Sequence, residues 1–487
     1  MRLAALLAVV VSVAALAAAA CGRTEGESVA AGAEVVPADV AVFAALDTDL
    51  DSEQWQNAED LAERFPRGDF LRRFLARELE RDYGLDLERD VEPAVGPELD
   101  FVVLPPSPDE AEPPVAVLTQ PRDPAKLDEL LERSGEEVVK DEIGDWTVIA
   151  TSEEVLNAFR PLANGEGESL ADSERFTEAM APLEGDAIAK VYVNAEAAGR
   201  ELEEANVPLT GLCSVGGELI SAGAALRAED DGVRLESTST EEGGEELEAY
   251  EARFVDELPA GAALYVSFDE LARQFEETRE QLRAQMPDLD RELEEAERLL
   301  GVSLEEDVLP LLEGEGAFAV YPSALIPTVT LALEVEDEER ASETVDRIVA
   351  RLGVENPGLE TRETEIAGLP AKEVRINEML AVYYAAFDGT LVVTTTPVGI
   401  EGLRGDGTKL ADDARFEDAT EAAEMPDETT GFVYVDADEA VGLAEGLAAL
   451  QGENIPSDVR ENLEPLGTAV LYGARDEVCF SGFLSID

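Results

Sequence analysis

The sequence predicts an α+β fold built from two related copies, each a mostly antiparallel sheet with helices packed on one face. Two repeated signatures and a repeated order of strands support this prediction. GLDLERDVEP at 84–93 recurs as GVSLEEDVLP at 301–310, a spacing of 301 − 84 = 217 residues. LADSERF at 170–176 recurs as LADDARF at 410–416, a spacing of 416 − 176 = 240. Such self-similarity indicates an internal duplication.

Each copy opens on a short β-rich run, at 37–43 and at 259–265. A helical pattern follows, and Pro66 or Pro287 interrupts it, because proline breaks or kinks a helix. After the first signature each copy predicts two strands, an amphipathic helix and a further strand. These lie at 99–104, 115–118, 123–134 and 146–150, and at 316–321, 328–333, 337–352 and 391–395. The second copy holds extra sequence, in which 374–376 and 380–384 predict a hairpin that is either added or better preserved than in the first copy.

The second signature begins a helix in each copy. Asp172 and Asp412 are predicted N-caps, with Phe176 and Phe416 on the buried face. Further strands are predicted at 191–194, 219–227 and 232–238, and at 433–436, 467–474 and 477–486. Many strands separated by tight turns, with helices inserted at two or three points, are typical of α+β domains.

These patterns divide the chain into five parts. Residues 1–20 are predicted to be a lipoprotein signal peptide and 21–36 a flexible tether. The first copy spans 37–240, a partly helical linker spans 241–257, and the second copy spans 258–487. The copies would form either two lobes with a cleft or one continuous sheet.

The N-terminus predicts export. Arg2 precedes an apolar run from 3 to 20, which is the layout of a secretory signal. AAACG at 18–22 is similar to a bacterial lipobox, which predicts lipidation of Cys21 and attachment to the outer face of the cytoplasmic membrane. An uncleaved membrane helix and simple secretion are the alternatives.

Two further cysteines, Cys213 and Cys479, lie near the ends of the two copies. Exported chains commonly pair such cysteines, so we expect one disulfide that joins the halves. Two free buried thiols are the alternative.

The charge is strongly unbalanced. Against 110 acidic residues stand 36 basic ones, for a net charge of −74. Such a surface repels nucleic acid and anionic lipid headgroups, so the only predicted membrane contact is the lipid anchor. We expect a saline environment, because salt screens self-repulsion; a generally acidic set of exported proteins is the alternative.

No histidine is present. This excludes Ser-His and Cys-His nucleophilic catalysis and histidine-ligated zinc or haem. Phosphate-binding and dinucleotide-binding glycine motifs are also absent from the sequence. We therefore expect no enzymatic activity, no cofactor and no resident metal.

Carboxylates alternate at Asp47, Asp49 and Asp51, which are candidates for weak cation binding. A calcium loop would need glycine at its sixth position and glutamate at its twelfth, where Ser52 and Ala58 stand. A helix start explains the run better, because acids are stabilised at a helix N-terminus.

The acids repeated between the copies are Glu88 with Asp90, and Glu305 with Asp307. Paired carboxylates could act as in glycosidases. A pair present in both copies is more typical of capping and turn roles, because an active site needs only one copy.

The two signatures and the paired aromatic strands resemble an uncharacterised family of bacterial lipoproteins, a domain of unknown function from high-GC Gram-positive bacteria. The resemblance implies location and architecture and supplies no catalytic residues. We expect a non-enzymatic, lipid-anchored protein that binds an envelope ligand or a protein partner. A carboxylate-only glycan hydrolase and a structural surface spacer are the alternatives.

Overall fold

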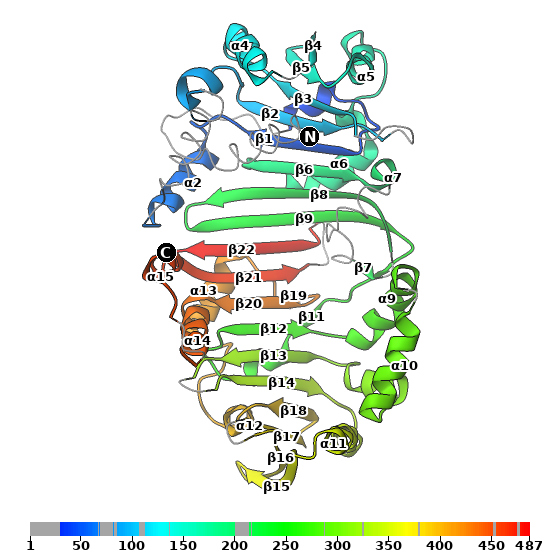
Figure 1. Cartoon of the computed structure of the whole chain (residues 1–487), viewed down its shortest axis with the longest axis vertical. Coiled ribbons are helices and arrows are strands. Elements are labelled where there is room, and N and C mark those ends of the chain that lie inside the picture. Colours follow the sequence, from blue (N-terminus) through cyan, green and yellow to red (C-terminus); the bar gives the residue numbers. More distant parts are fainter. Residues whose placement is uncertain are drawn as a thin grey trace.

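A computed structural model describes residues 30–66, 68, 81, 85–106, 113–135, 137–199, 214–215, 217–286, 288–323, 326–377, 380–450, 454–474 and 478–487. One sheet of 18 strands runs through the molecule, and every pair of neighbouring strands in it is antiparallel. Figure 1 shows the strands stacked along the long axis of the molecule. The α+β class with a large antiparallel sheet is confirmed, and the two copies share one continuous sheet.

The first copy supplies one half of the sheet. From the outer edge inward its strands are β4 (Val139–Ile143), β5 (Trp146–Ala150), β3 (Val115–Thr119), β2 (Glu98–Val103), β1 (Val42–Asp47), β6 (Ala189–Asn194), β8 (Glu218–Glu229) and β9 (Gly232–Glu242).

The second copy supplies the other half. From the centre outward its strands are β22 (Phe480–Ile486), β21 (Leu466–Gly473), β20 (Phe432–Asp436), β12 (Leu264–Phe268), β13 (Gly316–Tyr321), β14 (Thr328–Glu334), β18 (Thr390–Thr394), β17 (Ala381–Phe387), β16 (Leu369–Arg375) and β15 (Glu360–Ile366). Two small ribbons pair β7 (Ser214–Val215) with β10 (Glu245–Glu246), and β11 (Tyr250–Glu251) with β19 (Glu428–Thr429).

Strand register confirms the residue correspondence between the copies. Phe43 of β1 lies opposite Tyr192 of β6, and Tyr265 of β12 lies opposite Tyr434 of β20. The offsets are 265 − 43 = 222 and 434 − 192 = 242, so both strands and their pairing recur. The first signature's offset of 217 also holds in the sheet, where Glu98 of β2 corresponds to Glu315 before β13.

The two halves meet where β9 pairs with β22, from Ser237 opposite Phe480 to Gly232 opposite Ser485. The last strand of each copy therefore completes the hydrogen bonding of the other's edge. Backbone ladders satisfy the amide and carbonyl groups there, which leaves no cleft between the copies along this line.

The insertion in the second copy differs from the prediction in one respect. β17 pairs with β18 as β4 pairs with β5, so β17 belongs to the shared plan. The added strands are β15 and β16, which form the hairpin at the far edge of the sheet. The prediction was wrong about which strands were added because the charged stretch ETRETEI of β15 lacks the apolar alternation of a half-buried strand.

Four helices of the described chain pack over the buried aromatic positions on one face of the sheet, which we call the helix-covered face. Here α5 (Glu153–Ala163) and α6 (Glu174–Met180) cover the first copy, while α12 (Pro397–Arg404) and α13 (Ala414–Ala422) cover the second. Buried rings join these layers: Phe176 of α6 packs edge-on against Tyr192 at 5.1 Å, and Phe416 of α13 packs edge-on against Tyr434 at 5.1 Å. The duplication therefore extends to the aromatic core.

Other helices pack at the margins of the opposite face. α2 (Glu53–Glu63) packs Trp55 and Leu61 against Leu46 and Ala228, and α11 (Glu338–Glu355) packs against Leu333 and Leu391. The remaining helices are α4 (Pro124–Ser134), α7 (Ala195–Ala198), α9 (Leu271–Gln285), α10 (Leu289–Leu300), α14 (Ala437–Leu450) and α15 (Ser457–Leu463). Short turns complete the fold at η1 (Ala31–Val35), η2 (Leu87–Val91), η3 (Leu170–Asp172), η4 (Ala181–Leu183), η5 (Arg253–Asp256), η6 (Leu304–Val308) and η7 (Leu309–Leu311).

Two boundaries differ from the predictions. η1 lies in the segment predicted as tether, yet Ala33 and Val36 are buried in the first core, so the fold begins before Pro37. The predicted linker holds the end of β9, the strands β10 and β11, and η5, whose Phe254 is buried in the second core.

The predicted N-caps are displaced by one residue. Ser173 occupies the N-cap position of α6, and Asp413 caps α13 by accepting a hydrogen bond from the Arg415 backbone amide. Asp172 instead ends η3 and accepts a hydrogen bond from the Ser169 hydroxyl. Adjacent acidic and hydroxyl residues are all good caps, so composition alone did not distinguish them.

Within the part of the chain that the structure describes, no helix combines the length and the apolar character needed to cross a bilayer. The predicted signal peptide and Cys21 lie outside the described residues.

Candidate functional site

The first candidate surface is the face of the central sheet opposite α6 and α13, which we call the open face. It is formed by the residues of the central strands that alternate with the buried aromatic positions. Its members are Val42, Ala44, Val191, Ala224, Leu226, Leu235, Leu471, Leu484, Val433, Val435, Leu264, Val266 and Phe318.

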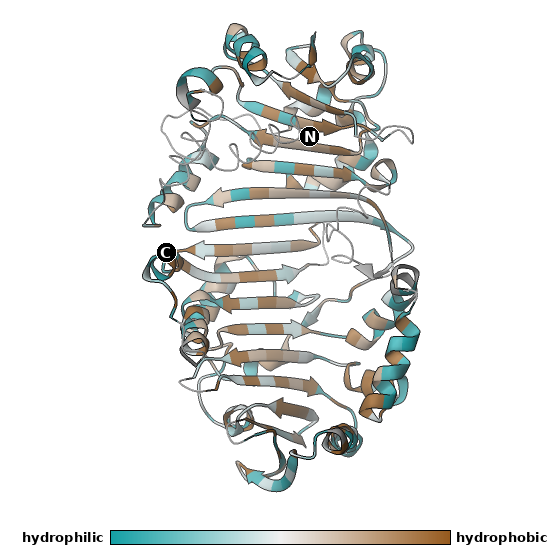
Figure 2. Cartoon of the chain, in the orientation of Figure 1, coloured by the Kyte–Doolittle hydropathy of each residue, from teal (hydrophilic) through white to brown (hydrophobic). Residues whose placement is uncertain are grey.

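The open face stays accessible at its centre. Leu235 of β9 is 44% exposed and Leu471 of β21 is 36% exposed, and Gly482 of β22 lies between them in the sheet. Figure 2 shows hydrophobic residues recurring along the central strands, while the most hydrophilic helices, such as α10, lie at the margin. A contiguous apolar surface is typical of an interaction site, whereas single apolar residues scattered over a surface are not.

The described positions of the open face in β2, β1, β6, β22, β21, β20, β12 and β13 include no charged side chain. This contrasts with a chain whose net charge is −74. The chain therefore places its charges elsewhere and keeps a wide neutral surface.

The helix-covered face holds buried ionisable groups instead. Asp47 lies opposite Glu98 in the sheet, and Asp100 is two residues further along β2. Burial raises the pKa of Asp47 to about 7. Burial and the neighbouring Glu98 carboxylate raise the pKa of Asp100 well above its ordinary value, and neither Asp100 oxygen meets a hydrogen-bond donor among the described residues.

Lys190 of β6 lies on the same face and is almost fully buried. Burial lowers its pKa, and the nearby Arg227 charge acts in the same direction. Carboxyl groups with pKa values near neutrality can exchange protons. Here Asp47 and Asp100 are buried, with Gly32 of η1 packed against Asp100, where a polymeric substrate does not reach them.

The three candidate cation-binding carboxylates do not converge. Asp47 accepts hydrogen bonds from the Asp49 amide (2.8 Å) and the Ser52 hydroxyl (2.5 Å). Asp49 forms an ion pair with Arg122 at 2.6 Å. Asp51 contributes its backbone carbonyl to Gln56. The described residues contain no group of three or more acidic or cysteine side chains arranged to hold a metal ion.

The repeated acids hold the same turn in each copy. Asp90 accepts a hydrogen bond from the Asp86 amide at 3.0 Å, and Asp307 accepts one from the Ser303 amide at 2.9 Å. The offset is again 303 − 86 = 217. The pKa values of both carboxyls are lowered, chiefly by the Arg89 side chain at Asp90 and by the Ser303 amide at Asp307.

A basic residue from the following helix neutralises each of these acids. Arg133 of α4 lies 3.8 Å from Asp90, and Arg347 of α11 lies 2.5 Å from Asp307, with 347 − 133 = 214. The geometry is that of a structural junction. Glu305 pairs with Arg279 of α9 at 2.8 Å and does not join Asp307 in a catalytic pair.

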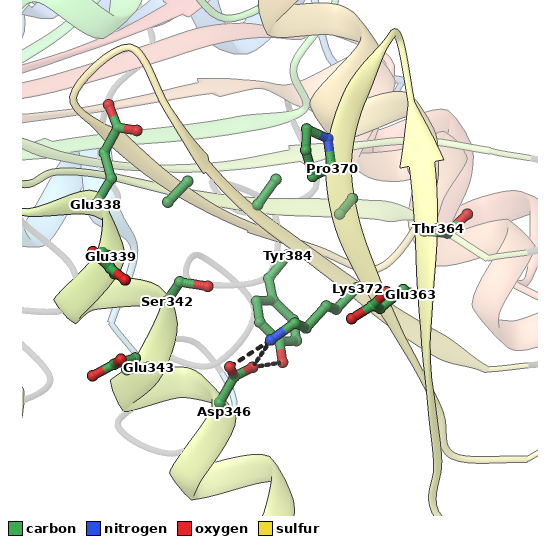
Figure 3. Close-up of a pocket in the computed structure, with 13 residues that line it drawn as sticks. Glu338, Glu339, Ser342, Glu343, Asp346, Glu363, Thr364, Pro370, Lys372 and Tyr384 are labelled. Carbon is green, nitrogen blue, oxygen red and sulfur yellow. Dashed lines mark hydrogen bonds and ion pairs between the residues drawn. The ribbon is translucent and has the colours of Figure 1, made fainter.

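One polar pocket of about 580 Å³ lies between α11 and the added hairpin. At its floor Asp346 of α11 forms an ion pair with Lys372 of β16 and accepts a hydrogen bond of 2.6 Å from the Tyr384 hydroxyl (Figure 3). Burial opposes ionisation of Asp346, but these two partners outweigh it and lower its pKa. The rim carries Glu338, Glu339, Glu343 and Glu363.

This pocket was not predicted, because its walls come from the unshared hairpin and from a helix defined only by its amphipathic pattern. The scarcity of lysine could have drawn attention to Lys372 in the sequence. Only five lysines occur in the chain, and two of them, Lys190 and Lys372, lie among acidic side chains inside the fold.

Cys479 is buried just before β22, and its Sγ accepts a hydrogen bond from the Ser239 amide of β9 at 3.1 Å. Cys213 lies outside the described residues. The disulfide between them remains a prediction.

Comparison with known families places the chain. A family described as "Protein of unknown function (DUF3352)" matches residues 2–142 and 134–469. The chain belongs to this family. Two matched segments agree with a duplicated architecture, and the resemblance to an uncharacterised family is confirmed. No curated protein and no solved structure matches the DUF3352 chain.

Proposed function

We propose that this DUF3352 protein is an exported lipoprotein of a high-GC Gram-positive bacterium, anchored through Cys21 on the outer face of the cytoplasmic membrane. Its role is to bind an apolar envelope ligand or protein partner without catalysing a reaction. The open face carries no charged side chain at its described positions over eight of its strands and exposes Leu235 and Leu471 at its centre, and this observation carries the proposal. Burying such a surface yields roughly 25 cal/mol per Å² of apolar area.

The acidic groups support binding over catalysis. The repeated acids Asp90 and Asp307 are neutralised by arginine, and Asp346 is held by Lys372 and Tyr384. Asp47 and Asp100 have raised pKa values but are buried. A glycosidase needs two accessible carboxyls, one of them a proton donor, flanking the substrate.

The anchor is tested by mass spectrometry of the mature N-terminus. We expect a lipid-modified Cys21, and we expect Cys21→Ala to release the protein from the membrane fraction. An unmodified Cys21 would contradict the anchor.

The binding surface is tested with the neutral apolar fluorophore N-phenyl-1-naphthylamine and the chain from residue 22 onward, which contains every described residue. We expect saturable fluorescence enhancement that the double variant L235E/L471E abolishes. The matched control is V398E, because Val398 is 57% exposed on α12, which packs on the helix-covered face. Equal binding by all three proteins would contradict the proposed surface.

A further inference from the structure

Three occupants could cover the apolar side chains of the open face. They are the same face of a second copy, the surface of a bilayer and the acyl chains of a single lipid. Resting on the proposed function, we infer that the open face binds the acyl chains of a single membrane lipid whose headgroup is zwitterionic or uncharged. Charge, dimensions and chain length each favour this occupant.

Charge argues against a second copy. Two chains of net charge −74 packed face to face would bring their acidic margins together, and repulsion between like charges of this size opposes association. Two helices at these margins are acidic. α10 carries the sequence LDRELEEAERLL, and α11 opens with two glutamates. The same charge repels an anionic bilayer surface.

A lipid monomer avoids this repulsion. Its acyl chains contact only the neutral side chains of the open face, such as Val191, Leu226 and Val433. Its headgroup remains in water at the margin, so the cost of burying a polar group is avoided. An anionic headgroup would be opposed by the acidic margin, whereas a zwitterionic headgroup would not.

The dimensions fit acyl chains. The eight strands from β1 to β12 are separated by seven spacings of about 4.8 Å, so the central face extends about 34 Å across the strands. The hydrocarbon core of a bilayer is about 30 Å thick and contains two acyl lengths, so one chain is about 15 Å long. The width of the open face across the strands therefore exceeds the length of one acyl chain.

The segment between Cys21 and the folded sheet is short enough to keep the open face near membrane lipids. Ala30, the first described residue, lies nine positions after Cys21, and nine extended steps of the chain reach at most about 30 Å. Ala30 packs against the first core. An anchor at Cys21 therefore keeps the folded sheet within reach of the bilayer, which raises the effective concentration of lipid at the open face.

The experiment displaces N-phenyl-1-naphthylamine from the chain 22–487 with two lysolipids of equal acyl length, lysophosphatidylcholine and lysophosphatidylglycerol, below their micellar concentrations. We expect lysophosphatidylcholine to displace the probe and to do so at least tenfold more effectively than the anionic lysophosphatidylglycerol at low salt. High salt should narrow this difference, because the repulsion is screened. L235E/L471E should bind neither lipid, and V398E should behave as wild type.

Probe binding without displacement by lysophosphatidylcholine would overturn this inference and leave the proposed apolar binding surface standing. Failure of probe binding would overturn both. Sedimentation of the wild type as a dimer that L235E/L471E dissociates would assign the face to a second copy and would likewise overturn the lipid inference. Circular dichroism of each variant distinguishes loss of binding from loss of folding.

Discussion

Glu98 and Glu315 are equivalent residues of the two copies, and each accepts hydrogen bonds from two consecutive backbone amides. Glu98 accepts them from Ala31 (3.3 Å) and Gly32 (3.0 Å), and Glu315 accepts them from Arg253 (3.1 Å) and Phe254 (3.0 Å). The amides recur with an offset of 253 − 31 = 222. Both glutamates thus tie the segment that precedes the first strand of a copy to the middle of that copy's sheet.

Replacing Glu315 with alanine should destabilise the fold. Alanine offers no acceptor oxygen, so the backbone N–H groups of Arg253 and Phe254 both lose their partner, each at a cost of about 1–3 kcal/mol. Urea denaturation measures the change in the free energy of unfolding. Glu313→Ala is the control, because Glu313 is exposed. Equal effects of the two substitutions would contradict the capping role of Glu315.

Acidification from neutral pH should stabilise the protein. Burial raises the pKa of Glu315 and of Asp47 to about 7, from ordinary values of 4.5 and 3.8. The folded state therefore binds more protons than the unfolded state between these limits, and stability is lost as pH rises through about 7. Each group contributes up to about 1.4 kcal/mol per pH unit.

Urea midpoints measured between pH 7.5 and 5 test this direction. We expect the midpoint to rise as the pH falls, and a flat or falling midpoint would contradict the assignment. Below about pH 3.8 the trend should reverse, because the pKa values of Asp90 and Asp307 are lowered in the fold and their contribution is lost on protonation.

Asp100→Ala should leave the protein as stable at pH 7 or make it more stable. Asp100 is fully buried and meets no hydrogen-bond donor in the described part of the chain, and its equivalent in the second copy is Ala317, since 317 − 100 = 217. Removing an unpaired polar group saves about 1–3 kcal/mol of desolvation, less the loss from a small cavity. The reciprocal control, Ala317→Asp, should destabilise the second copy. A large loss of stability in Asp100→Ala at pH 7 would show that the carboxyl has a required partner.

Two tyrosine substitutions compare a hydroxyl that donates a hydrogen bond to a carboxylate with one that has no hydrogen-bond partner among the described residues. Tyr384→Phe removes a hydrogen bond of 2.6 Å to the Asp346 carboxylate, and bonds to charged groups contribute about 1.5–3 kcal/mol. Tyr192→Phe removes a buried hydroxyl that has no hydrogen-bond partner among the described residues, so it should be neutral or stabilising. The free energies of unfolding of the two variants give the comparison. The reverse order would contradict the pocket's hydrogen-bond network.

Salt should raise stability. With a net charge of −74 the folded chain repels itself, and the screening length falls from about 10 Å at 0.1 M salt to about 3 Å at 1 M. We expect a higher urea midpoint in 2 M than in 0.1 M sodium chloride. Equal midpoints would remove the support for a saline environment.

The sequence predicted the repeated strands well, because a pattern found at equivalent positions of both copies supports the same element twice. The spans of β5 and β13 agree with the predictions residue for residue, and Phe176 and Phe416 are buried as expected. The predictions failed where one copy stood alone. β15 exposes charged residues on a sheet edge, so its pattern resembles that of a loop.

The candidate site was harder to predict than the fold. Leu235 and Leu471 alternate with polar or buried residues as any half-buried strand does, and the sequence does not state which face a helix covers. That distinction depends on α6 and α13 packing against the opposite face, which is a long-range contact. The role of Asp346 depends in the same way on Lys372, 26 residues away.

The junction of β9 with β22 also bears on the ancestry of the chain. Following the paired strands, β9 corresponds to β22 with an offset of 245, so Glu236 lies opposite its own counterpart, Ser481. Leu235 faces Gly482 and Ser237 faces Phe480, which are the same pairing seen from either copy. This is the symmetry of a homodimer whose subunits join edge to edge. The two halves are therefore arranged as the subunits of a dimer would be, within one covalent chain, and the hairpin of β15 and β16 with the polar pocket beside α11 breaks this symmetry in the second half.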